Sequence, residues 1–66
     1  MSGIVAGLTG QCPTITFMVR DRTVTTSGTT RFNDGCDRIK NNVRVEAKGA
    51  LTPNGALMAT SVELDD

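Results

Sequence analysis

The chain contains no histidine, tryptophan or tyrosine, and only two phenylalanines occur among its 66 residues. The missing histidines remove the side chain that most often serves as a general acid or base, and no pair of carboxylates or activated nucleophile replaces them. The shortage of aromatic rings leaves few surfaces on which bases or sugars could stack. We therefore predict that the protein is not an enzyme and that it holds no metal and no cofactor.

An excess of charge of one sign is also missing. Seven basic and seven acidic residues give a net charge of zero, and neither sign forms a block. A nucleic-acid-binding protein normally carries a basic patch, because phosphate contacts dominate its affinity. No apolar run approaches the roughly 18 residues that cross a bilayer, and residues 1–3 are too few and too polar for a signal peptide. The sequence predicts neither a nucleic-acid partner nor membrane insertion.

The small size of the chain makes a covalent cross-link valuable. A single domain of residues 1–66 gains little from hydrophobic burial beyond its loss of conformational entropy. Cys12 and Cys36 are the only cysteines, and two interpretations stay open: a disulfide, or two reduced thiols that pack as small apolar residues. Disulfides persist outside the cytosol, so the first interpretation implies a secreted, periplasmic or cell-surface protein, expressed as the mature part or a module of a longer precursor.

Alternating apolar residues predict β-strands along the whole chain. In the clearest run, residues 14–20, Ile15, Phe17 and Val19 face one side, and Met18 on the other side is expected beneath a loop or at an interface. Asp21 and Arg22 are predicted to form a tight turn. Further strands are predicted at residues 3–10 with Ile4, Ala6 and Leu8 inward, at 23–26 with Val24 and Thr26 inward, at 29–32 with Thr30 and Phe32 inward, at 43–49 with Val43, Val45 and Ala47 inward, and at 56–64 with a bend near Thr60 and Ser61.

Glycine, proline and asparagine separate these strands. The Asn-Asp-Gly sequence at residues 33–35 and the Thr-Pro-Asn-Gly sequence at 52–55 predict turns. Residues 37–41 are too few for a full helix, but Asp37 is expected to cap one helical or 3₁₀ turn that places Ile39 at the end of the core, and Asn42 is expected to end that turn in the left-handed region. No segment can hold three helical turns. The fold class is therefore all-β, as a small barrel or sandwich.

The sequence resembles, over nearly its whole length, a bacterial family catalogued as domain of unknown function 5666. The likeness rests on Val-Arg-Val-Glu-Ala-Lys-Gly at residues 43–49, and on an Asn-Gly turn followed by Leu-x-Ala-Thr-x-Val-x-Leu within residues 54–64. In the first half it rests on the Cys12-Pro13 pair and Cys36. Asn42 departs from the pattern, which usually has glycine there, but asparagine tolerates the left-handed conformation.

This resemblance implies a small OB-like β-barrel of five or six strands, with one short 3₁₀ or helical turn near residues 37–41. Members of the family are often exported and often occur in tandem. The family subset that carries a Cys-Pro pair and a second cysteine favours a disulfide between Cys12 and Cys36. The resemblance implies no activity.

The two phenylalanines are the candidates for a ligand surface. OB-type barrels often bind oligonucleotides or oligosaccharides across one sheet face, where aromatic rings act as stacking platforms. Phe17 and Phe32 both fall in the inward phase of their strands, and this phase favours core packing over ligand stacking.

Charged residues offer two weaker candidate sites. Arg20, Arg22 and Arg31 could gather to hold an anion, although the neighbouring acidic residue and the balanced composition favour a solvated face. Asp34 and Asp37 flank Gly35 and could supply oxygen ligands to calcium, but their spacing fits no calcium loop, and turn and cap chemistry accounts for both.

We therefore expect a non-enzymatic structural or interaction module of an exported bacterial protein, which binds protein, including other copies of itself, or is repeated in tandem. The alternative is an OB-type module that binds a glycan or another small ligand. Exposed rings of Phe17 or Phe32 would favour that alternative, whereas Met18 and threonines on an exposed sheet face would favour assembly.

Overall fold

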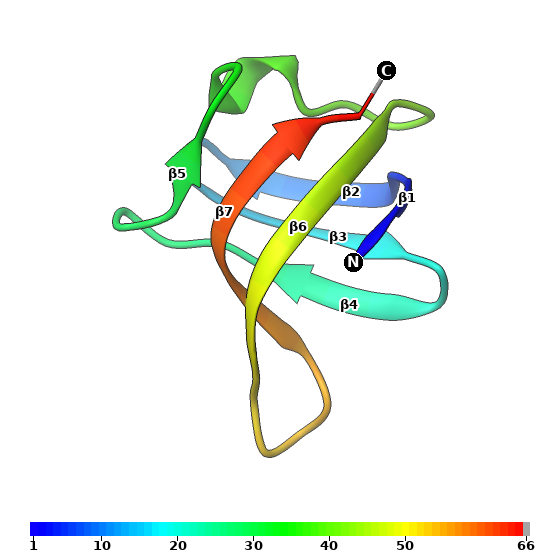
Figure 1. The fold of residues 1–66 in the computed structure, drawn as a ribbon, viewed down its shortest axis with the longest axis vertical. Coiled ribbons are helices and arrows are strands. Elements are labelled where there is room, and N and C mark those ends of the chain that lie inside the picture. Colours follow the sequence, from blue (N-terminus) through cyan, green and yellow to red (C-terminus); the bar gives the residue numbers. More distant parts are fainter. Residues whose placement is uncertain (66) are drawn as a thin grey trace.

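A computed structural model describes residues 1–65 as seven β-strands and one 3₁₀ turn, with no α-helix in that range (Figure 1). The predicted all-β class is confirmed. The elements are β1 (Ser2–Ile4), β2 (Ala6–Gln11), β3 (Thr14–Val19), β4 (Arg22–Thr25), β5 (Arg31–Phe32), η1 (Cys36–Arg38), β6 (Arg44–Leu51) and β7 (Leu57–Leu64).

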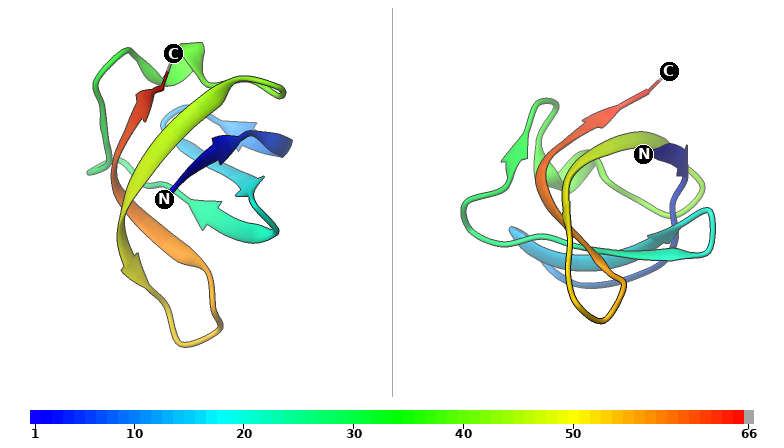
Figure 2. Two further views of the ribbon diagram at one scale, coloured as in Figure 1. Left: turned by 45° about the vertical axis from the view of Figure 1, so that its right-hand side comes forward. Right: turned by 60° about the horizontal axis from the view of Figure 1, so that its bottom comes forward.

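All seven strands belong to one strongly coiled sheet, which wraps around the core without closing (Figure 2). The strand order is β1-β6-β7-β4-β3-β2, and β5 adds to the far part of β7. Most neighbours are antiparallel, but β7 pairs in parallel with β4 through Leu57 and Met58, and with β5 through Ser61 and Val62. The strands at the two ends of this order, β1 and β2, are consecutive in the sequence.

Seven strands form rather than five or six because the first predicted strand divides at Val5. The Val5 amide donates to the carbonyl of Val43 at 2.9 Å, and its carbonyl accepts from Asn42 at 2.8 Å. Before Val5 the chain pairs with β6, and after it with β3. The change of partner bends the chain and creates two short strands.

The predicted inward face of this first segment is wrong for Ile4 and Ala6. Ile4 is 47% exposed and Ala6 is exposed, whereas Gly3 and Val5 point inward and Leu8 is half-buried. A Cβ on Gly3 would lie 2.8 Å from the Val19 side chain. Only glycine, which has no side chain, therefore allows the backbone to lie this close to β3. Because glycine is not counted as an apolar residue, the alternation of residue types does not show that Gly3 and Val5 face the core.

The central strands have the predicted core faces. Phe17, Val19, Val24, Val45 and Ala47 are fully buried, and Ile15 is nearly so. Met18 points outward, on the predicted side of the strand, but it is 39% exposed and no loop of residues 1–65 covers it. The remaining core residues are Val5 between β1 and β2, Ile39 directly after η1, and Leu57, Ala59 and Val62 on β7.

The turn between β3 and β4 lies one residue earlier than predicted. Arg20 and Asp21 occupy it with φ values of 54° and 68°, and Val19 and Arg22 form the closing pair. Two left-handed residues match the twist of a two-residue hairpin. Asn-Gly is the residue pair that typically predicts such a turn, because both residues tolerate positive φ values, whereas Arg-Asp is not typical of it.

The 3₁₀ turn also begins earlier than predicted, at Cys36. Gly35, with φ of 97°, precedes it and provides no side-chain cap, so the predicted capping role of Asp37 is wrong. Ile39 is 4% exposed and enters the core as expected, and Asn42 is left-handed, with φ of 73°.

The hairpin of β6 and β7 contains the predicted bend. Lys48 pairs with Ser61 and Gly49 pairs with Ala59, so Thr60 is an extra residue on β7. This bulge moves the buried side chains from the phase of Leu57 and Ala59 to that of Val62. A Cβ on Gly49 would overlap the carbonyl of Met58, and the bulge therefore requires glycine on the partner strand.

A buried hydroxyl joins the β2–β3 turn to the end of β4. Thr26 is 3% exposed; its Oγ1 accepts from the Ile15 amide at 2.9 Å and donates to the Pro13 carbonyl at 2.6 Å. We expect Thr26→Val to lower the free energy of unfolding by about 1–3 kcal/mol, because it leaves a buried amide without its acceptor.

Urea unfolding followed by circular dichroism measures this effect, since the chain has no tryptophan or tyrosine for fluorescence. Thr26→Ser keeps the hydroxyl and is the control. A Thr26→Val variant as stable as the wild type would show that the hydroxyl does not contribute.

Candidate functional site

One outer region of the sheet is composed of uncharged side chains. Cross-strand pairing places Thr9, Thr16, Thr25, Met58 and Ala50 in one row that crosses β2, β3, β4, β7 and β6. A second, shorter row across β2, β3 and β4 contains Ala6, Met18 and Thr23. Directly paired residues lie on the same side of a sheet, so the eight side chains form one surface, which we call the Thr/Met face.

The Thr/Met face is open to solvent. Met18 and Met58 are each 39% exposed, and Ala6, Thr9 and Ala50 are also exposed. The Oγ1 atom of Thr25 donates to the Met58 sulfur at 3.7 Å, which orients that thioether on the surface. None of the eight residues is charged, although 21% of the chain is Asp, Glu, Lys or Arg. Flexible thioethers and methyl groups on a surface without charge are suited to contact with another protein.

The two phenylalanines do not line this face. Phe17 is fully buried opposite Val24, and Phe32 is half-buried and packs against the core. The sequence has no other aromatic residue. The stacking alternative therefore lacks the exposed rings on which it depended.

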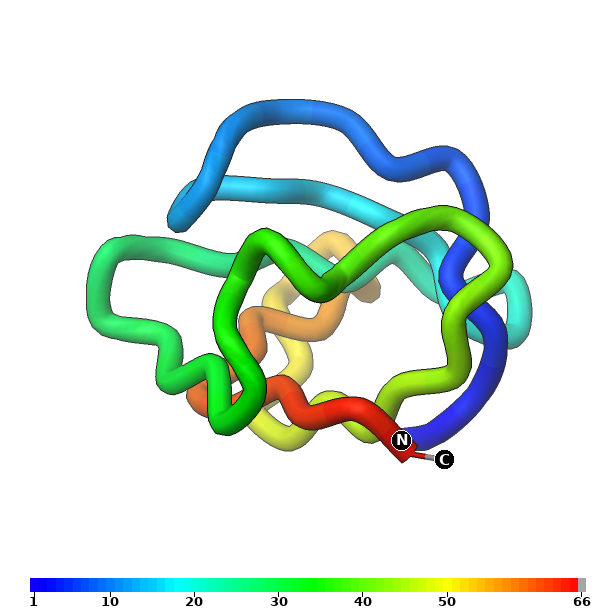
Figure 3. The backbone as a smooth tube through the Cα atoms, turned by 90° about the horizontal axis from the view of Figure 1, so that it is seen from above, coloured from blue at the N-terminus to red at the C-terminus, as the bar shows by residue number. Residues whose placement is uncertain are grey.

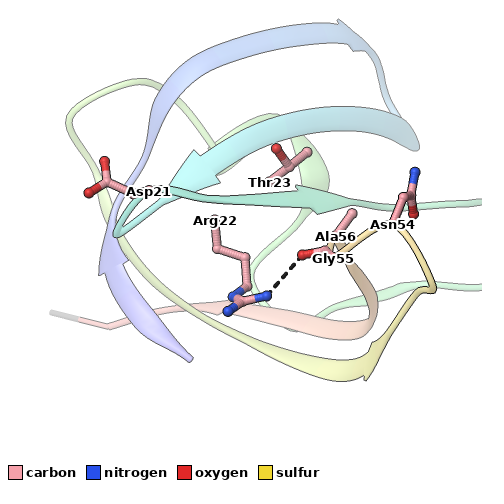
Figure 4. Close-up of a pocket in the computed structure, with 6 residues that line it drawn as sticks. All are labelled: Asp21, Arg22, Thr23, Asn54, Gly55 and Ala56. Carbon is pink, nitrogen blue, oxygen red and sulfur yellow. Dashed lines mark hydrogen bonds between the residues drawn. The ribbon is translucent and has the colours of Figure 1, made fainter.

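The three candidate arginines do not come together. Arg20 lies in the β3–β4 turn and Arg22 follows that turn, whereas Arg31 begins β5 on the opposite side of the molecule (Figure 1). The Arg22 guanidinium donates to the Gly55 carbonyl at 2.9 Å and so connects the β3–β4 turn to the β6–β7 loop. This contact crosses an open cleft of about 330 Å³ lined by Asp21, Arg22, Thr23, Asn54, Gly55 and Ala56 (Figure 4).

Asp34 has a structural contact of its own. Its Oδ2 atom accepts from the Leu64 amide at 2.9 Å and ties the turn after β5 to the end of β7. Within residues 1–65, no three His, Cys, Asp or Glu side chains gather closely enough to hold a metal ion. The same part of the chain forms no helix of the length and hydrophobicity that a membrane crossing requires.

Cys12 and Cys36 lie at disulfide distance. Their sulfurs are 2.02 Å apart and their Cα atoms 5.9 Å apart. Cys12 belongs to the exposed β2–β3 turn, and Cys36 begins η1 and packs against the core. Of the two interpretations left open by the sequence, the geometry agrees with the bonded pair, which joins the outermost hairpin to the segment that inserts Ile39.

The fold and the site define a small all-β module with a cysteine pair and an uncharged sheet face. The chain belongs to the family described as "Domain of unknown function (DUF5666)", whose family model matches residues 2–63. The matched range includes both cysteines and the whole Thr/Met face. None of the curated proteins and none of the solved structures matches the chain.

Proposed function

We propose that the protein is a non-enzymatic interaction module of an exported bacterial protein, and that it associates with further copies of itself through the Thr/Met face. The observation that carries this proposal is the set of eight uncharged outer residues, among which two methionines are 39% exposed. The cysteine pair at disulfide distance supports export, because such bonds persist in oxidising compartments.

An OB-like barrel is the architecture we propose for this module. The support is topological: residues 2–11 pair first with β6 and then with β3, and so connect the two ends of the sheet order through one bent segment. The parallel pairing of β4 with β7, followed by β6 next to β7, continues the sheet from β3 round to β1. The bulge at Thr60 and the bend at Val5 supply the curvature that a small barrel needs.

A second copy suits the Thr/Met face better than a charged partner does. The face offers no ion-pairing group, and a net charge of zero means that two copies do not repel each other over long range. Each threonine hydroxyl can both donate and accept a hydrogen bond, so the same surface can face itself across a two-fold axis. Tandem repetition would place such copies at high local concentration.

We expect the wild-type protein to form a dimer whose population rises with concentration, and Met18→Glu/Met58→Glu to weaken association roughly 100-fold or more. Burying four carboxylates in a two-fold interface costs several kcal/mol, and each 1.4 kcal/mol is tenfold in affinity. Both positions are exposed, so the variant should keep its fold. Light scattering over a concentration series, with circular dichroism as the folding check, measures the effect.

Ile4→Glu is the matched control, because Ile4 is 47% exposed on β1, opposite Arg44 and outside the Thr/Met face. It should associate as the wild type does. A wild-type protein that stays monomeric across the series, or a control that loses association equally, would refute self-association through this face.

A further inference from the structure

The oxidisable side chains of this protein are its methionines. The sequence has no tryptophan, tyrosine or histidine, and both cysteines lie at disulfide distance from each other. Three methionines remain, and none belongs to the buried core formed by the described residues. Met1, Met18 and Met58 are each 39% exposed, so an oxidant in solution can reach all three side chains.

We propose that Met18 and Met58 are sites of reversible oxidation to the sulfoxide, and that this modification dissociates the copies that associate through the Thr/Met face. The inference rests on the proposed self-association and adds its regulation. Both sulfurs lie on that face, so one chemical step turns its two apolar thioethers into polar sulfoxides. The oxidant acts on the separate copies, in which both side chains are open to solvent.

The step requires a hydroperoxide or a related two-electron oxidant, which an oxidising extracytoplasmic compartment can supply. The thioether sulfur attacks one oxygen of the hydroperoxide, a sulfur–oxygen bond forms and the oxygen–oxygen bond breaks. With hydrogen peroxide the proton on the transferred oxygen moves to the departing hydroxide, which leaves as water. Sulfur is oxidised by two electrons, and methionine sulfoxide reductases reverse the change.

The surroundings of the two sulfurs suit a sulfoxide as well as a thioether. Met18 is paired with Thr23, and the Thr25 hydroxyl already donates to the Met58 sulfur at 3.7 Å. A sulfoxide oxygen is a stronger hydrogen-bond acceptor than a thioether sulfur, and threonine hydroxyls on the neighbouring strand can donate to it. The oxidised side chains therefore remain stable on the surface of the folded monomer, whereas in the interface each sulfoxide would lose its water to contact with the methionines, alanines and threonine methyl groups of the second copy.

The test compares wild type with Met18→Leu/Met58→Leu before and after hydrogen peroxide treatment. Leucine keeps the apolar character and approximate size of methionine but cannot take up oxygen. Peptide mapping by mass spectrometry locates the added oxygen, circular dichroism checks the fold, and light scattering measures association. We expect oxidised wild type to associate about tenfold or more weakly, a loss of at least 1.4 kcal/mol. The treated leucine variant should stay associated.

The outcomes separate this inference from the proposed function. Untreated wild type that is monomeric at every concentration overturns the self-association and, with it, this regulation. Association that survives complete oxidation of Met18 and Met58 overturns the regulation alone. Dissociation of the treated leucine variant as well assigns the effect to another site, such as Met1, and also overturns it.

Discussion

Loss of the Cys12–Cys36 link is expected to lower the free energy of unfolding by about 3.5 kcal/mol. The two cysteines are separated by 24 residues, and a cross-link over that distance restricts the unfolded chain. The total stability of a natural domain is about 5–15 kcal/mol, and a chain of this size should lie toward the lower end. Reduction should therefore remove a large share of the stability.

Thermal unfolding followed by circular dichroism, with and without reductant, measures this effect. A loss of 3.5 kcal/mol corresponds to a fall in Tm of roughly 15–25 °C for a domain of this size. Cys12→Ser/Cys36→Ser should reproduce the reduced value and should not respond to reductant. Equal Tm values under both conditions would show that the pair contributes nothing to stability.

Phe17→Ala is expected to destabilise the protein by about 3–5 kcal/mol, which for so small a domain approaches complete unfolding. Phe17 is the largest fully buried side chain, and it lies in the middle of β3, opposite Val24. Strands on every side are fixed by backbone hydrogen bonds, so they cannot collapse far into the space that the ring leaves.

Phe32→Ala is the matched control for this substitution. Its ring is half-buried on the two-residue β5, so the same truncation should cost distinctly less. Urea unfolding of the three proteins gives the comparison. Equal losses for the two variants would contradict the central position of Phe17 in the core.

Strand faces could be predicted wherever the two sides of a strand differ in residue type. On β3 the buried Ile15, Phe17 and Val19 alternate with Thr14, Thr16 and an exposed methionine. A period of two with such contrast has one stable placement, because a shift by one residue would expose the whole core face. The same contrast made the inward faces of β4 and β6 predictable.

The first segment lacked that contrast. Gly3 faces the core through close backbone approach, which leaves no trace in a hydrophobic pattern. The exact position of the turn at Arg20 and Asp21 could not be predicted for a related reason, because neither residue type is typical of positive φ values.

The Thr/Met face could be predicted only in part. Met18 stood out from the sequence because it interrupts the outer face of a clear strand. Met58 did not, because its place beside Thr25 depends on a parallel pairing between segments 33 residues apart. Local patterns carry no information on which distant strands become neighbours. The grouping of three candidate arginines failed to appear for the same reason.

The position of the cysteine pair relative to the chain ends bears on how the module responds to mechanical load. Met1 and Asp65 bond to opposite sides of β6, through Ala47 and Arg44, so one strand holds both ends of the described chain, on the same side of the molecule in the view of Figure 3. Both ends lie outside the 24-residue loop that the pair closes. When such a module is pulled at its two ends, the disulfide keeps the loop between the cysteines from being stretched. At about 3.4 Å for each of its residues, the unfolded chain with the disulfide would extend roughly 80 Å less than the chain without it. Formation of the disulfide would therefore limit how far the protein extends under load.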